Sequence, residues 1–440
     1  MSDSTVIGLM VAAFLLLLLA GHYIHSLLMV AGIGGLVLLD GMDILTGLLG
    51  PQPFARTAAY TLTTIPLFVL MAQFILQADI VKDLFYVVNK FSRGRKGVLG
   101  SLTLVAGAML GAVSGSGTAT AASLGQVAVP ELEQHGFKAP LAGAVAAAAG
   151  SLSGIIPPSI ILILYGVATE TPIGDLFIAA VIPGVMVTLV FIGIMMVYLR
   201  RSSAGLEELQ AHSELPPVIP VGRLLVSVTV SLVIVVVVFG GIYSGMITPT
   251  EAGAVGALAA FVAALLLGRV NAGYLTRSLT ETVKVTVMVM LILIGAQIFG
   301  RFVSLSLIPR RLIELLAPVV ETPFLMLMIL ALVFFVLFMF IEGAAVILMS
   351  VPVVLPIIET MGVDITWFGV FVAVICTVGL ITPPVGLSVY AVSGATGIPS
   401  DSIFRYALVF ALAATLIVTT VMILVPETAT WLPTLGEAKA

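Results

Sequence analysis

Apolar runs of about 20 residues recur along the whole chain, from Val6 to Val425, and they restrict the possible folds more than any other feature. A helical run of about 20 residues crosses a hydrocarbon core of roughly 30 Å. Only helices and closed barrels satisfy their backbone hydrogen bonds in lipid, and the short alternating segments typical of a membrane barrel are nowhere sustained. The sequence therefore predicts an all-α polytopic membrane protein that contacts membrane lipids.

The composition excludes several classes of protein. Of the 440 residues, 60% are hydrophobic and 9% are charged, whereas soluble domains have roughly 45–50% and 25%, so a soluble globular protein is excluded. The 18 Lys and Arg residues form no basic stripe, so no nucleic acid is expected as a partner. No Gly-Lys-Ser or Gly-Lys-Thr motif occurs, so we expect no ATP at this chain.

The chain contains an internal duplication. Pro157-Pro158 in the first half matches Pro383-Pro384 in the second half at a residue-number difference of 226. The same difference joins Pro130 to Pro356, Glu133 to Glu359, Gly136 to Gly362, Gly143 to Gly369, Ile155 to Ile381 and Asp175 to Asp401. Further upstream, Ala72-Gln73 matches Ala296-Gln297 at a difference of 224. We therefore predict two repeats, over residues 1–222 and 223–440.

Each predicted repeat contains two interrupted apolar runs. The runs at about 98–129 and about 324–355 carry a polar break near the middle, as expected of re-entrant hairpins. The runs at about 139–165 and about 365–391 contain the Pro-Pro pairs, which remove backbone donors and unwind a helix. If each hairpin enters and leaves on one side, each repeat crosses the membrane an odd number of times. The two repeats are then inverted relative to each other.

The polar breaks of the hairpins are candidate binding sites. Ser114 to Thr118 places hydroxyl groups and glycines midway along an apolar run. Freed carbonyls and hydroxyls could replace the hydration shell of a small cation there, and a helix N-terminus could face an anionic substrate. A patch of small residues for helix packing is the alternative. Glu342, in the second hairpin, is either a functional ligand or a cap of the hairpin tip, because a lone carboxylate is costly at this depth.

The two Pro-Pro breaks, Gly154 to Ser159 and Leu380 to Gly386, are expected to expose backbone carbonyls. Discontinuous helices at corresponding positions of two repeats are typical of a transporter site near the membrane midplane. The alternative is a pair of purely structural kinks. Their duplication beside a duplicated hairpin favours a functional role.

The remaining notable polar residues have structural interpretations. Thr248, Pro249 and Glu251 fit a capping box at the start of a helix. Lys284 and Arg301 lie near the ends of their apolar runs, where long cationic side chains reach the membrane interface. We therefore assign no chemistry to these residues.

Six motifs, in the expected order and covering nearly the whole chain, resemble one known family. This family is the large membrane subunit of tripartite ATP-independent periplasmic (TRAP) transporters, of the dicarboxylate and sialate type. The motifs are Ile65-Pro66-Leu67-Phe68, Ala112-Val113-Ser114-Gly115-Ser116 with Ala119-Thr120, Gly154 to Ser159, Gly241 to Gly245, Thr248 to Ala252, and Thr382 to Leu387. The chain departs from the family's common pattern at Gln73, Gly117-Thr118 and Ile375.

The resemblance implies an elevator-type ion transporter fold in a bacterial inner (cytoplasmic) membrane. It implies a subunit of a sodium-coupled secondary transporter, a symporter that imports organic anions, especially carboxylates. A periplasmic substrate-binding protein is expected to deliver the substrate, and a small four-span membrane subunit is expected as a second partner. Na⁺, rather than ATP, is the expected coupling factor.

Carried over residue by residue, the resemblance places ligands at the hairpin tips and the breaks. One cation site is implied around Ser114, Ser116, Gly154 and Pro157, and a second around Gly343, Thr382, Pro383 and Gly386. We expect the substrate to contact Ser116, Thr118, Ser159, Glu342 and Val385.

Two other functions remain open at this point. A stand-alone ion-coupled carboxylate symporter would have similar hairpins but no binding protein. A membrane-embedded lipid-modifying enzyme would ordinarily show clustered acidic or His residues at a membrane face, whereas the 22 carboxylates here are scattered. We therefore expect no catalytic residues.

The distribution of charge predicts the orientation. The loops 79–98, 130–139, 200–223, 269–284 and 392–405 hold 13 of the 18 Lys and Arg residues, and positive loops lie in the cytoplasm. We expect the 200–223 loop to be cytoplasmic and both termini to be external. Reporter fusions within this loop and after Lys439 will test the orientation, and an external 200–223 loop would contradict the inverted-repeat model.

Overall fold

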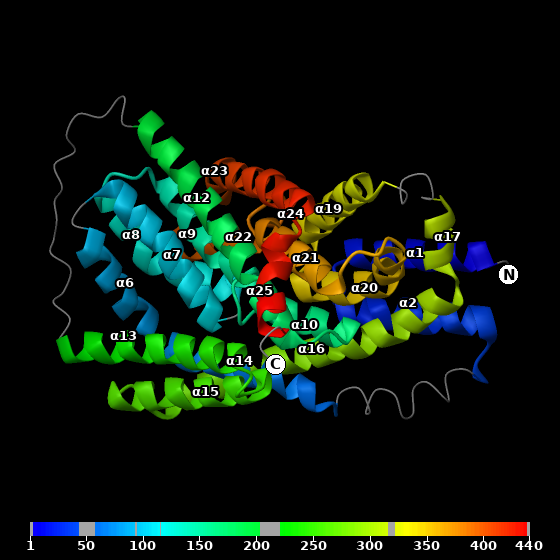
Figure 1. Cartoon of the computed structure of the whole chain (residues 1–440), viewed down its shortest axis with the longest axis horizontal. Coiled ribbons are helices and arrows are strands. Elements are labelled where there is room, and N and C mark those ends of the chain that lie inside the picture. Colours follow the sequence, from blue (N-terminus) through cyan, green and yellow to red (C-terminus); the bar gives the residue numbers. More distant parts are fainter. Residues whose placement is uncertain are drawn as a thin grey trace.

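The computed structural model describes residues 3–43, 58–92, 95–114, 116–202, 221–315 and 322–437, and every regular element in these ranges is helical (Figure 1). Eight of the described helices are long and apolar enough to cross a membrane. The all-α polytopic prediction is therefore confirmed. Ser114 ends a described helix, but its side chain and all of Gly115 lie outside the described residues, as do Arg93 and most of the 200–223 loop.

The first half of the chain forms helices in the following order: α1 (Asp3–Leu19), α2 (Ile24–Asp40), η1 (Tyr60–Thr63), α5 (Thr64–Gln77), α6 (Ile80–Ser92), α7 (Lys96–Ser114), α8 (Gly117–Gln134), α9 (Ala139–Ser151), η2 (Leu152–Gly154), α10 (Ile160–Thr169), α11 (Ile173–Ala179) and α12 (Val181–Ser202). The predicted first hairpin corresponds to α7 and α8. The predicted first broken helix corresponds to α9, η2 and α10, with Pro157-Pro158 in the interruption.

The second half follows the same plan: α13 (Val221–Val235), η4 (Val236–Gly240), α14 (Gly241–Tyr243), α15 (Pro249–Leu266), α16 (Ala272–Leu305), α17 (Ile308–Leu315), α19 (Pro323–Phe340), α20 (Gly343–Thr360), α21 (Ile365–Gly379), α22 (Leu387–Thr396), α23 (Ser400–Ala414), η5 (Thr415–Thr419), α24 (Thr420–Leu424) and α25 (Glu427–Glu437). Here α19 and α20 correspond to the hairpin, and α21 and α22 to the broken helix. The inversion of one repeat relative to the other stays a prediction.

Duplicated positions adopt the same local structure in both halves. Both Pro-Pro peptide bonds are cis. Gly136 and Gly362, which follow α8 and α20, both have positive φ, at 82° and 66°, a conformation that glycine adopts at helix C-termini without steric cost. The duplication in the sequence is therefore also a duplication of backbone conformation.

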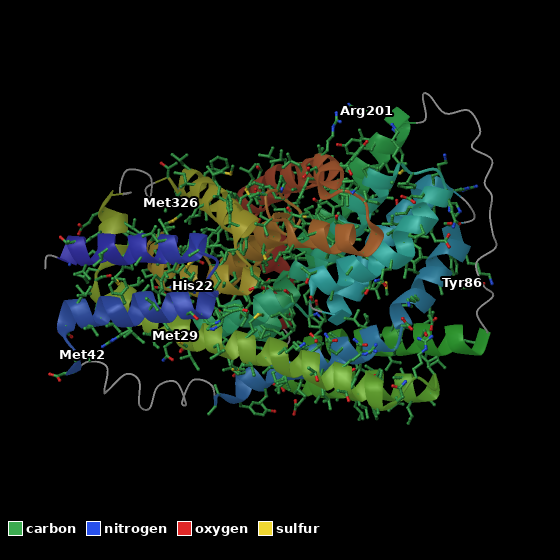
Figure 2. The ribbon with its side chains drawn as sticks, turned by 180° about the vertical axis from the view of Figure 1, so that it is seen from behind. His22, Met29, Met42, Tyr86, Arg201 and Met326 are labelled. Carbon is green, nitrogen blue, oxygen red and sulfur yellow. The ribbon has the colours of Figure 1, made fainter. Side chains whose placement is uncertain are left out.

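Helices of each half pack against helices of the other half. Helix α2 of the first half packs on α16 of the second, and α15 of the second half packs on α5 of the first. The same exchange occurs around the breaks, where α10 packs on α20 and α22 packs on α8. Figure 1 shows the long helix α16 running beside α2, with α13 and α15 toward the other end of the molecule. Figure 2 places Met42, just after α2, and Tyr86 on α6 at opposite ends. Each half thus completes the core of the other.

Two segments that the sequence analysis assigned to loops are helical. Helix α6 occupies most of the 79–98 segment, and α16 starts at Ala272 within the 269–284 segment. Asn271 caps α16 by accepting from the backbone N–H of Tyr274 at 2.9 Å, and the Tyr274 hydroxyl donates to the Phe74 carbonyl at 3.1 Å. The polar residues of these segments therefore lie on helices that tertiary contacts hold in place.

A buried polar cluster anchors α6. The Asp83 carboxylate is fully buried, accepts a hydrogen bond from Ser227 Oγ at 2.9 Å, and pairs with Arg269 at 3.4 Å. These contacts join α6 to α13 and to the segment that precedes α16. A buried carboxylate is tolerated only when it is paired in this way. The predicted capping box is also confirmed, because Glu251 N–H donates to Thr248 Oγ1 and Thr248 N–H donates to the Glu251 carboxylate.

Helices α7, α8 and α9 approach closely because they carry glycines at their contacts. A Cβ added at Gly150 would lie 2.5 Å from the backbone nitrogen of Ala121 on α8, and one at Gly111 would lie 2.8 Å from Ser153. Neither position can accept a side chain unless the backbones separate.

We expect Gly150→Ala to destabilise the protein by about 1–3 kcal/mol, the usual cost of overpacking. The measurement is the midpoint of thermal unfolding of the purified protein in detergent. Gly193→Ala on α12 is the matched control, because a Cβ there meets no atom within 4 Å, and we expect its midpoint to stay at or above that of the wild type. Equal midpoints for both variants would contradict the packing analysis.

Candidate functional site

Both hairpin tips and both breaks meet at one cavity of about 250 Å³. Helices α5 and α16 complete its wall. The lining residues are Val69, Ala72 and Gln73 from α5; Ser116, Gly117 and Thr118; Ser153, Gly154, Ile160 and Ile161; Val285, Met288 and Val289 from α16; Glu342, Gly343 and Ala344; and Cys376, Leu380 and Leu387. Segments far apart in the chain are therefore brought together around a single space.

The two hairpin tips place equivalent capping residues at the cavity. Ser116 caps α8 by accepting from Ala119 N–H at 3.4 Å, and Glu342 caps α20 by accepting from Ala345 N–H at 3.4 Å. Their residue numbers differ by 226, so they occupy the same place in the two repeats. The N-termini of α8 and α20 thus meet the cavity, where their free N–H groups favour negative charge.

Glu342 has one of the two roles that the sequence left open, because it is the cap of the second hairpin tip. Its side chain is exposed at the wall of the cavity, and its role as a functional ligand stays a prediction. A carboxylate that faces a cavity avoids much of the cost of burial in apolar surroundings. The structure therefore supports Glu342 as a residue that a bound solute can touch.

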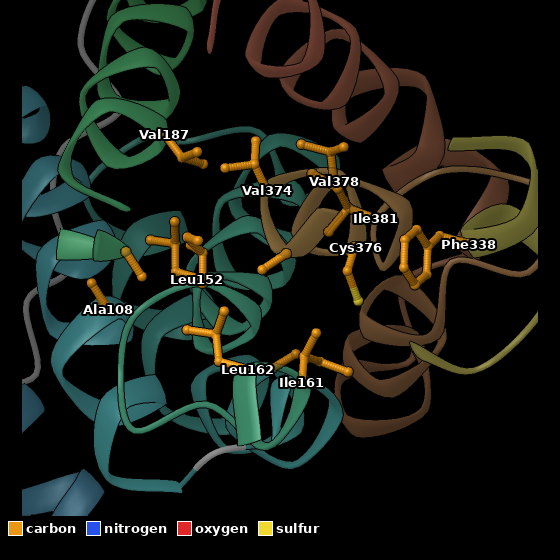
Figure 3. Packing of buried hydrophobic residues seen from close by; sticks show 14 of the residues in the cluster. Ala108, Leu152, Ile161, Leu162, Val187, Phe338, Val374, Cys376, Val378 and Ile381 are labelled. Atoms are coloured by element: carbon orange, nitrogen blue, oxygen red, sulfur yellow. The ribbon is translucent and has the colours of Figure 1, made fainter. Parts of the chain in front are cut away.

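The second hairpin is in direct contact with the second break. Val385 N–H, in the second break, donates to the Met339 carbonyl of the hairpin at 3.3 Å. A Cβ at Gly343 would lie 2.7 Å from Ile161 Cδ1 and 2.8 Å from Cys376 Sγ. Figure 3 shows Ile161, Cys376, Phe338 and Ile381 gathered in this packing. Glycine at the tip leaves room for the side chains of α10 and α21, the helices that flank the two breaks.

The residues predicted to contact substrate divide into two groups. Ser116, Thr118 and Glu342 line the cavity, and the Ser116 and Thr118 hydroxyl oxygens lie 3.3 Å apart. Ser159 is buried instead, where its hydroxyl donates to the Gly154 carbonyl at 2.8 Å and caps α10. Val385 is half-buried in the second break and does not appear in the cavity wall.

The residues predicted to bind cations divide in a similar way. Ser116, Gly154 and Gly343 line the cavity, whereas Pro157 is buried in the first break. Thr382 is buried and donates its hydroxyl hydrogen to the Val378 carbonyl at 2.7 Å. Pro383 and Gly386 lie in the second break, outside the cavity wall, and Ser114 ends α7 with its side chain outside the described residues.

The described lining of the cavity carries a negative charge. Its lining contains one carboxylate, Glu342, and no Lys, Arg or His among the described residues. No group of three or more His, Cys, Asp and Glu gathers anywhere in the described part of the chain. Helix N-termini, hydroxyls and backbone carbonyls are therefore the polar groups available here, and they suit a hard cation that takes oxygen ligands together with a carboxylate.

Two polar residues that line the cavity, Gln73 and Ser153, were not predicted as ligands from the sequence. Gln73 lines the wall from α5, and its match with Gln297 in the duplication was the available signal. Ser153 lines the wall between the first break and the Gly117 tip, and its repeat mate is Gly379, so the duplication gave no signal. The Ser153 hydroxyl is buried and has no hydrogen-bond partner among the described residues.

A family model described as "Tripartite ATP-independent periplasmic transporter, DctM component" matches residues 11–428. The C4-dicarboxylate TRAP transporter large permease protein DctM of Pseudomonas aeruginosa is 32% identical over 81% of this chain and 82% of its own length. The sialic acid TRAP transporter large permease protein SiaM of Vibrio cholerae is 32% identical over 79% and 80%. The crystal structure of the Alcanivorax borkumensis YdaH transporter matches with a TM-score of 0.65 at 15% identity, over 87% of this chain and 89% of that one, which shows a shared fold.

We expect Ser153→Ala to leave the protein as stable as the wild type or more stable, when sodium and substrate are absent. The reason is that an unsatisfied buried hydroxyl costs about 1–3 kcal/mol. Ser151→Ala is the matched control, because the buried Ser151 hydroxyl donates to the Ala148 carbonyl at 2.9 Å, and this variant should lose stability. Thermal unfolding in sodium-free buffer measures both, and a large loss for Ser153→Ala would show that its hydroxyl has a structural partner.

Proposed function

This chain belongs to the DctM-component family of tripartite ATP-independent periplasmic transporters, and on that premise we propose that it imports organic anions, carboxylates among them, by coupling to sodium. The named relatives are transporter permease subunits and not enzymes, and the chain is a multi-pass protein of the bacterial inner membrane. The relation to this family argues against a membrane-embedded lipid-modifying enzyme.

One observation carries the proposal: two helix N-termini and two unwound segments meet at a single cavity. Helix N-termini are suited to carboxylates, and unwound backbone in a membrane is tolerated where it lines such a cavity. C4-dicarboxylates and sialic acid appear in the names of the two relatives that are 32% identical. Carboxylates are therefore the substrate class that we propose.

Sodium is the coupling ion in this proposal because the cavity carries no cationic side chain among its described lining residues. A bound cation would supply the positive charge that an organic anion needs beside Glu342. The Ser116 and Ser153 hydroxyls and the Gly154 backbone are the groups of the first repeat that would hold it. Gly343, Thr382, Pro383 and Gly386 are the residues proposed for a second ion.

Two partners complete the proposed system. A periplasmic binding protein would deliver the substrate, and a small four-span membrane subunit would associate with this chain. The family description, "tripartite" and "periplasmic", supports both partners. A stand-alone symporter is the second candidate, and it differs in needing neither partner.

Uptake by proteoliposomes tests the proposal and separates the two candidates. Succinate and sialic acid are suitable probes, since they represent the classes named for the relatives. We expect saturable uptake that requires a sodium gradient, this chain, the small subunit and the binding protein together. Strong uptake by this chain alone would favour the stand-alone symporter. Uptake at the same rate with and without a sodium gradient would contradict sodium coupling.

Two substitutions examine the second cation site within the same assay. Thr382→Val removes one oxygen at nearly constant volume, so we expect several-fold more sodium to be needed for half-maximal uptake.

Glu342→Gln keeps an acceptor for Ala345 N–H but removes the charge. Unchanged sodium dependence would limit Glu342 to capping, whereas weaker dependence would assign its charge to coupling. Yield and monodispersity control for folding, and a well-folded Thr382→Val protein with wild-type sodium dependence would remove the second site.

A further inference from the structure

Ten of the thirteen hairpin-and-break residues that line the cavity form pairs between the two repeats. The tip residues 116–118 correspond to 342–344 at a residue-number difference of 226, and both sets line the cavity. Gly154 and Leu380 form a further pair of this kind, as do Ile161 and Leu387. We call these ten residues the carrier side. The carrier side therefore contains both members of five residue pairs, and under the predicted inversion of the repeats these members would face opposite directions.

The facing wall on α5 does not have this property. Val69, Ala72 and Gln73, which we call the first wall, correspond to Leu293, Ala296 and Gln297 on α16 at a difference of 224. These three α16 residues, the second wall, line a separate cavity of about 170 Å³. The two copies of one wall therefore face two different spaces.

In this structure the second wall faces the middle of α20 and the end of α10, and not the hairpin tips. Its cavity is closed by Leu348, Val351 and Pro352 of α20 and by Val167 and Ala168 at the end of α10, and Leu62 and Glu170 complete the lining. These α20 residues follow the tip residue Ala344 along the same helix. A helix rises 1.5 Å per residue, so a slide of roughly 6–12 Å along the helix axis brings the tip to the level of the second wall.

We infer that Leu293, Ala296 and Gln297 form the alternative wall of the substrate cavity, with Gln297 taking the place of Gln73 at the substrate when the carrier side has moved. This inference rests on the proposed function, because it assumes that the carrier side moves during transport. Both glutamines are half-buried, and an amide offers a donor and an acceptor to a carboxylate or hydroxyl group. The Gln73–Gln297 pair thus gives the substrate the same polar partner in both states.

A glutamine at each wall affects the balance between the two conformational states of the transporter. A ligand shifts a conformational equilibrium only by the difference in its affinity for the two states. If only Gln73 existed, bound substrate would hold the carrier side at the first wall. With Gln297 at the second wall, the glutamine contact favours neither state, so this contact does not hold the carrier side at one wall.

A pair of introduced cysteines makes the exchange measurable. Cys376, the only cysteine in the sequence, is 1% exposed and therefore serves as an unreactive background thiol. Leu387→Cys supplies a thiol on the carrier side, because Leu387 is half-buried and lines the cavity, and each wall cysteine is combined with it. The variants are Gln73→Cys and Gln297→Cys, with Ala72→Cys and Ala296→Cys as a second pair in case either glutamine variant folds poorly. Val287→Cys is the control, because Val287 lies on α16, is 50% exposed and lines neither cavity.

Each double variant is expressed with the partner subunits and treated in membranes with a short bifunctional maleimide, in sodium and in choline buffer. Links to position 387 are detected by peptide mass spectrometry. We expect links from both walls, none from Val287→Cys, and opposite changes in the yields from the two walls when sodium is replaced. Links from the first wall alone, in a complex that takes up substrate, would overturn the inference and leave the proposed function intact. Links from both walls in a complex without uptake would support the exchange and contradict the proposed function.

Discussion

The need to satisfy backbone polar groups inside a membrane governs this architecture. Helical segments satisfy their own carbonyls and amides, but the hairpin tips and Pro-Pro breaks do not. In this chain the freed groups are satisfied partly within each break and partly by contact between a break and a hairpin. Val385 N–H bonds to the Met339 carbonyl, Ser388 N–H bonds to the Leu380 carbonyl at 3.0 Å, and Ser159 Oγ bonds to the Gly154 carbonyl. The hairpin tips and the ends of the breaks also line the cavity, so the interruptions of the helices and the candidate site coincide.

Close approach at the centre depends on small residues and on exchange between the halves. Gly150, Gly111 and Gly343 each lie against a neighbouring segment at distances that a side chain would prevent. Around them, α10 packs on α20 and α22 on α8, so each break is supported by the opposite hairpin. The result is a central unit whose two halves contribute equivalent groups, Ser116 and Glu342 being the clearest pair. That pair is equivalent in place but different in charge, which makes the two tips chemically distinct.

Much of the fold was predictable because its causes are local or duplicated. Apolar run length predicted the membrane helices, the Pro-Pro pairs predicted the interruptions, and Thr248 with Glu251 predicted a helix start. Helix α6 and the first turns of α16 were not recognised, because Tyr274 and Asp83 hold them through contacts with residues distant in the sequence. In the site, Ser116, Thr118 and Glu342 were predictable from their position in polar breaks. Ser153 was not, because only the packing of the breaks reveals that its hydroxyl is buried without a described partner.

The exchange of helices also affects the order of events during synthesis. Helix α5 ends at Gln77, but its partner α15 begins at Pro249. At a ribosomal rate of about 5–20 residues per second, roughly 10–40 s separate the two. During that interval the contact face of α5 is left to lipid or to the insertion machinery. Packing of the first half therefore cannot finish before α15 of the second half has entered the membrane, and a chain that stops early leaves the contact face of α5 without its partner.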